Sequence, residues 1–131
     1  MRLPSLPHPH LIVLRSAATV VLSCLVGQAG WAAAFLGDDP RYRAVHEVGA
    51  WVTLVVCVVA AVTYLALRRS AGPVNVVLAL VVAVLAAVQF SLGMLGVTAP
   101  HIFLGVLLAM AGTALTSWTY RHELPPPRPS A

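Results

Sequence analysis

Charged residues are scarce in this sequence. Only 9% of its 131 residues are charged: four are acidic, and all eight basic residues are arginines, with no lysine. A soluble domain usually carries about a quarter charged residues. The composition therefore excludes an ordinary soluble domain. The net charge of +4 comes from arginines at the ends of apolar runs, which is typical of a membrane protein and not of a nucleic-acid-binding one.

Cysteine is scarce as well. Cys24 and Cys57 both lie inside apolar runs, and the connecting segments contain no cysteine pair that could form an exposed disulfide. Thiols surrounded by hydrocarbon are usually inert. The sequence therefore gives no sign of a thiol-based redox centre.

Hydrophobic residues make up 60% of the chain and gather in four long runs. A helix needs about 20 apolar residues to cross a bilayer. Turn-forming segments separate the runs, so we expect an all-α membrane protein, a four-transmembrane-helix up-down-up-down bundle. The expected domain covers 11–120, with spans at about 11–36, 44–67, 74–97 and 101–120.

Arginine placement predicts the orientation. Six arginines fall on the side of the termini and only Arg41 and Arg43 on the other. By the positive-inside rule, both termini are cytoplasmic, including a short tail at 1–10 and a proline-rich tail at 121–131. Because the chain is rich in Ala, Val and Leu and has no lysine, we expect a GC-rich bacterial source and a multi-pass protein of the bacterial cytoplasmic membrane.

Two histidines occupy matching places. His46 and His101 lie at the outer ends of the second and fourth spans, which run in the same direction and should sit diagonally in the bundle. With neighbouring axes about 8–10 Å apart, the diagonal is roughly 12–14 Å. That gap suits one haem b held edge-on, with one imidazole bound to each face of the iron.

Nearby residues fit the same interpretation. Gly49 and Gly105 would leave room for the macrocycle, and Trp51 would pack beside it. Arg43, one turn before the first histidine, and Arg41 could pair with the haem propionates.

Each half of the chain also carries a glutamine in its first span, expected to hydrogen-bond between helices. These residues form a weak internal repeat: Gln28, His46 and Gly49, then Gln89, His101 and Gly105.

This pattern, with the segments 89–96 and Pro100–His101, resembles one four-helix half of the haem A synthase family. It is similar, too, to small four-helix bacterial membrane proteins of the same layout. The likeness covers about 22–120 and implies that His46 and His101 are haem ligands.

The sequence departs from the catalytic half of that family. That half has a glutamate three residues before its first histidine and an arginine just after it, whereas this chain has Arg43 and Glu47 there. The outer cysteine pair and the second half of the enzyme are missing too. The resemblance therefore implies haem b binding, as in the non-catalytic half. Haem A synthesis is not expected, and whether the chain is an enzyme stays open.

The sequence thus predicts a small membrane b-type cytochrome with one bis-histidine haem near the outer face. It would act in electron transfer or as a haem-bearing subunit of a respiratory or redox complex. A single haem on one side cannot carry electrons across the membrane unaided, so we expect a larger membrane complex or a homodimer. The alternative is a haem-free structural subunit or assembly factor, in which the histidines are merely interfacial.

Overall fold

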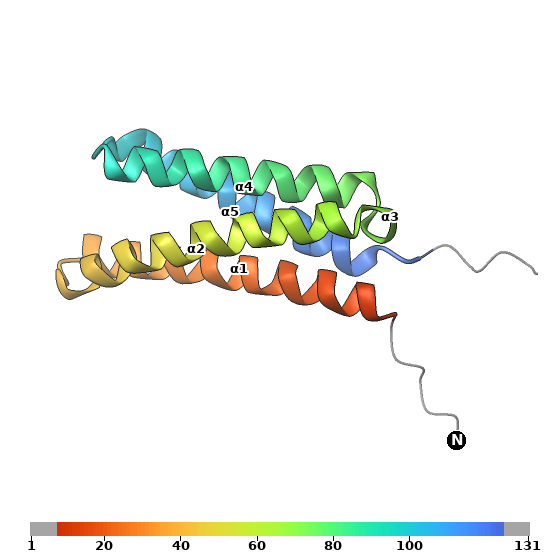
Figure 1. Ribbon diagram of the computed structural model, residues 1–131. Coiled ribbons are helices and arrows are strands. Elements are labelled where there is room, and N and C mark those ends of the chain that lie inside the picture. Colours follow the sequence, from red (N-terminus) through yellow and green to blue (C-terminus); the bar gives the residue numbers. More distant parts are fainter. Residues whose placement is uncertain (1–7, 125–131) are drawn as a thin grey trace, which may run out of the picture.

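The structure is a computed structural model that describes residues 8–124 (Figure 1). The first seven and last seven residues, which hold most of the two expected tails, lie outside this range. Within it, four helices are long and apolar enough to cross a membrane. A single-turn helix, α3, joins the second to the third of these. The elements are α1 (Pro9–Leu36), α2 (Arg41–Ala66), α3 (Arg68–Ala71), α4 (Pro73–Met94) and α5 (Thr98–Arg121).

Prolines mark where several helices begin. The first turn of a helix accepts proline, because its N–H groups have no partner inside the helix. α1 therefore opens on Pro9, and α5 already includes Pro100 in its first turn. α4 opens on Pro73, after Gly72 at a φ of +76° that favours glycine.

The helices form two hairpins that pack side by side. α1 packs on α2 and α5, and α4 packs on the same two helices. Consequently α2 and α5 lie diagonally across the bundle, as expected for the two spans that carry the histidines. The all-α, four-span, up-down-up-down architecture predicted from the sequence is confirmed.

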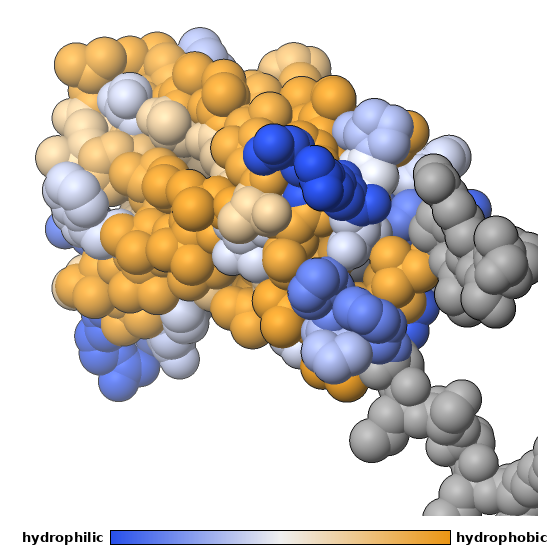
Figure 2. Space-filling model, turned by 45° about the vertical axis from the view of Figure 1, so that its right-hand side comes forward, coloured by the Kyte–Doolittle hydropathy of each residue, from blue (hydrophilic) through white to orange (hydrophobic). Residues whose placement is uncertain are grey.

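The surface around the bundle is apolar. Large aliphatic side chains point outward on every long helix, among them Val26, Val59, Val84 and Val106. Figure 2 shows hydrophobic residues over most of the visible face, with hydrophilic ones near the ends of the bundle. Such a surface is stable only in contact with lipid or with other membrane helices.

Buried residues are concentrated toward one end of the bundle. In α1 they lie between Leu11 and Leu25, in α4 between Asn75 and Ala86, and in α5 between Leu108 and Thr119. Most of these lie toward the end where the described chain begins and finishes, which we call the termini end, although α2 is also buried at Gly49, near its other end. The opposite end, the histidine end, carries the 37–40 and 95–97 connections, and there the two hairpins diverge (Figure 1).

Candidate cofactor site

His46 and His101 face one another at the histidine end. His46 comes from α2 and His101 from α5, and their ring centroids are 6.2 Å apart with ring planes at 89°. Both side chains are half-buried. The diagonal arrangement of the helices thus brings two distant histidines into one site.

Each imidazole is held by a main-chain carbonyl of its own hairpin. Nδ1 of His46 donates to the carbonyl oxygen of Gln28 on α1 at 3.2 Å, and Nδ1 of His101 donates to that of Gln89 on α4 at 2.9 Å. A carbonyl oxygen can only accept, so Nδ1 carries the proton and Nε2 keeps its lone pair. This is the arrangement that orients an imidazole as a metal ligand.

The glutamine side chains line the same cavity. Nε2 of Gln89 donates to Nε2 of His101 across 3.4 Å, a long hydrogen bond. Nε2 of Gln28 and Oε1 of Gln89 are buried without a hydrogen-bond partner. The site therefore contains one donor and one acceptor without hydrogen-bond partners. Burying such groups lowers the stability of the fold.

The two glycines make room for the glutamines. A Cβ on Gly49 would collide with the Gln28 amide and the Trp31 ring, and a Cβ on Gly105 would lie 3.0 Å from Nε2 of Gln89. The repeat found in the sequence thus has a structural basis. In each hairpin the main-chain carbonyl of the glutamine binds the histidine, and the side chain of the glutamine packs over the glycine.

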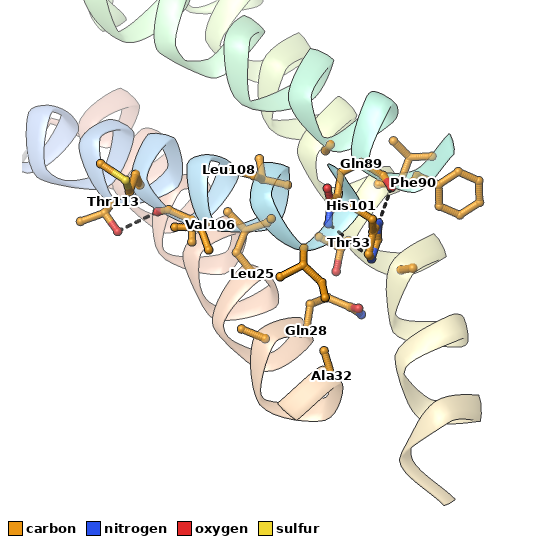
Figure 3. A pocket seen from close by; sticks show the side chains of 18 of the residues that line it. Leu25, Gln28, Ala32, Thr53, Gln89, Phe90, His101, Val106, Leu108 and Thr113 are labelled. Carbon is orange, nitrogen blue, oxygen red and sulfur yellow. Dashed lines mark hydrogen bonds between the residues drawn. The ribbon is translucent and has the colours of Figure 1, made fainter. Parts of the chain in front are cut away.

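A cavity of about 940 Å³ adjoins the histidines (Figure 3). This volume falls within the range of about 300–1,000 Å³ typical of ligand pockets. Many of its walls are alanines, whose small side chains keep the space open, and Thr53, Phe90 and Leu108 complete it. The cavity extends from the histidines along α5 as far as Trp118 and Arg121.

The arginines expected to meet a cofactor are paired with carboxylates. Arg41 binds Asp39 through two side-chain hydrogen bonds of 2.9 and 2.8 Å, and Arg43 binds Glu47 at 3.1 Å. The Arg41 guanidinium lowers the pKa of the Asp39 carboxyl, so this pair stays charged further into acid. Neither arginine lines the cavity.

Trp51 also lies outside the cavity. Its ring packs on Phe90 of α4, with centroids 4.4 Å apart, and the side chain is 56% exposed on the outside of the bundle. Five residues turn a helix by about 500°, which points Trp51 well away from the His46 face. Ala50 and Thr53, four and seven residues on from His46, are the ones that line the cavity.

Some residues near the histidines gave no signal in the sequence. Phe35 of α1 lies 6.0 Å from His46 between ring centroids, and Phe90 of α4 forms a cavity wall. Ala29, Ala32 and Ala33 of α1 line the cavity on the opposite side. Among residues 8–124, no group of three or more His, Cys, Asp or Glu side chains gathers to hold a metal ion. Comparison with protein-family models, curated proteins and solved structures finds no match.

Proposed function

We propose that this protein is a small membrane b-type cytochrome that binds one haem b between His46 and His101. The observation that carries the proposal is the neighbouring pair of imidazoles, each with Nδ1 engaged by a main-chain carbonyl and Nε2 unprotonated. A metal ion at Nε2 of His101 would replace the long hydrogen bond from Gln89. The cavity beside them supplies space that no side chain of the described residues fills.

The spacing of the rings fits one metal ion between them. With metal–imidazole bonds of about 2.0–2.1 Å and a ring radius of about 1.2 Å, the centroids of two opposed ligands lie roughly 6.4 Å apart. The observed separation is 6.2 Å.

The number of ligands favours a metal with a macrocycle over a bare ion. Zinc sites take three or four protein ligands. The described residues offer two histidines here and no cluster of three ligating side chains. Haem iron needs only axial ligands from the protein, because the porphyrin supplies the remaining four. The half-buried, largely apolar surroundings suit such a group.

The residues of the chain would hold and tune the cofactor. His46 and His101 would bind its iron, while the carbonyls of Gln28 and Gln89 keep both rings in the ligating tautomer and raise their basicity. Haem b supplies one-electron redox chemistry when bound. Arg41 and Arg43 already bind Asp39 and Glu47, so propionates would share these guanidinium groups with a carboxylate of the chain.

Electron transfer, or service as a haem-bearing subunit of a membrane redox complex, follows from a site at one end of the bundle. Electrons must reach and leave it on the same side, so we propose a redox partner within the membrane. The arginine count supports an orientation with both termini inside, and the composition supports a bacterial cytoplasmic membrane. We include in this proposal the likeness to the haem b half of haem A synthase. We do not propose haem A synthesis.

An absorption spectrum of the purified full chain, oxidised and then reduced with dithionite, tests the proposal. We expect a sharp Soret band and split visible bands on reduction. His46→Ala and His101→Ala should each abolish the low-spin spectrum, while His10→Ala, at the other end of the bundle, should retain it. A colourless folded protein from haem-replete cells would overturn the proposal and favour a haem-free structural subunit or assembly factor.

A further inference from the structure

The arginines at the two ends of the bundle differ in whether they form ion pairs. Within residues 8–124 the ion pairs are Arg41–Asp39 and Arg43–Glu47, both at the histidine end. Arg68, Arg69 and Arg121 at the termini end are exposed and carry no ion pair with a described residue. Glu123 is the one carboxylate that the described residues place there. Among residues 8–124, this end therefore keeps a net positive charge.

Hydrogen bonds at Ser70 bring together the segments that carry these arginines. Nδ1 of His10 lies 2.8 Å from Oγ of Ser70, and Nε2 of His122 donates to the Ser70 carbonyl at 2.9 Å. The start of α1, the single turn α3 and the end of α5 thus meet at one serine. Arg69 directly precedes Ser70 and Arg121 directly precedes His122, so both arginines belong to the segments that meet here. The Arg121 side chain turns back along α5, where its Nε donates to the Ser117 carbonyl at 3.2 Å.

Arg15, on the same side of the bundle, binds main-chain carbonyls at the end of α5. Its Nη2 donates to the carbonyls of Tyr120 and His122 at 3.2 and 3.5 Å, and its guanidinium lies over the Tyr120 ring. It satisfies carbonyls at the end of α5 that have no partner inside the helix. Arg15 therefore fixes the place of Arg121, and we do not count it among the residues that bind a ligand.

Aromatic residues lie beside Arg121. The guanidinium of Arg121 lies 4.9 Å above the Trp118 ring, and Tyr120 is its exposed neighbour. Trp and Tyr with arginines at the end of an apolar span are typical of the headgroup level of a membrane. The unneutralised charge thus faces lipid headgroups.

From these observations we propose that Arg68, Arg69 and Arg121 bind the phosphate headgroup of an anionic phospholipid at the termini end. Guanidinium groups donate several hydrogen bonds to phosphate oxygens. Basic pockets between membrane helices bind lipids of this class, with a preference of roughly fivefold for each arginine near the surface. The inference is independent of the haem, since it uses none of the residues of the cavity's histidine end.

Tryptophan quenching by brominated lipids can test the proposal on the full chain. In a Trp31→Phe, Trp51→Phe background, Trp118 alone reports lipid at the termini end. We would compare quenching by dibrominated phosphatidylglycerol and dibrominated phosphatidylcholine. We expect a severalfold preference for phosphatidylglycerol that falls at high salt, because salt screens the charges.

Two double variants complete the design. Arg68→Gln with Arg69→Gln, neither of which stacks on Trp118, should lower the preference to what Arg121 alone supplies. The matched Arg41→Gln with Arg43→Gln, at the histidine end, should leave it unchanged. An equal response to both lipids in the parent would overturn the inference, as would an undiminished preference in the Arg68/Arg69 variant. Full competition by 10-fold excess inorganic phosphate over lipid would assign a site for free anions instead.

Discussion

At the residue scale, the candidate site rests on one small unit used twice. A glutamine carbonyl on the first helix of each hairpin accepts from a histidine on the second, and a glycine lies beside the glutamine side chain. The histidines are the residues that a ligand would contact. The glycines act through the glutamines, so their substitution should affect the site indirectly.

Gly49→Ala tests this indirect role. The new methyl group would collide with the Gln28 side chain and the Trp31 ring, so we expect a loss of about 1–3 kcal/mol in the free energy of unfolding, as for overpacked cores. Gly30→Ala is the matched control, because nothing lies within 4 Å of its Cβ position. Thermal unfolding followed by circular dichroism measures both. Equal unfolding temperatures for the two variants would show that Gly49 is not crowded as the structure indicates.

At the scale of the elements, hydropathy predicts the spans but not their exact ends or facing. α2 and α5 each begin three residues before the expected 44 and 101. The charged residues at 41 and 43 and the proline at 100 hide those first turns from a pattern based on apolar runs. Helical periodicity predicts that Trp51 and His46 lie on different faces of α2. Only the packing of the helices shows which of these faces lines the cavity. The pairing of His101 with a main-chain carbonyl leaves no trace in the sequence.

A polar network ties the elements together near the termini end. The Tyr64 hydroxyl of α2 lies 3.1 Å from the Leu14 carbonyl oxygen of α1 and 2.7 Å from Oγ1 of Thr119 of α5, which lies 3.3 Å from Oδ1 of Asn75 of α4. Each hydroxyl has one proton, so the two protons serve two of these three contacts at a time. All three side chains are fully buried. Each of the four long helices thus contributes to one connected network where the packing is tight.

Thr119→Val should weaken this network. It keeps the shape of the side chain but leaves Tyr64 and Asn75 each without one partner, at a cost of about 1–3 kcal/mol. Thr63→Val serves as control, since Thr63 bonds only the Val59 carbonyl one turn earlier. Unfolding in a graded series of denaturing detergent would compare the two variants. A cost no larger for Thr119→Val than for the control would mean that the network adds nothing beyond the helices.

At the scale of the whole molecule, buried side chains are concentrated toward the termini end of the bundle, where the polar network also lies. The cavity opens beside the histidines and runs along α5, and two amide atoms without hydrogen-bond partners lie at its histidine end. Local stability follows the density of buried contacts. The hairpins should therefore open more readily at the histidine end, and a cofactor bound there would join them.

Hydrogen exchange of backbone amides measures this asymmetry. In protein free of haem, amides in 28–36 and 98–105 should exchange faster than those in 14–25 and 108–119. Haem at 100 times its dissociation constant should slow the first set by up to about 100-fold, equivalent to about 2.7 kcal/mol, and affect the second set less. His101→Ala should lose this protection. If both ends of the haem-free protein exchange equally slowly, the histidine end is closed by packing alone, and no bound group is needed to join the hairpins.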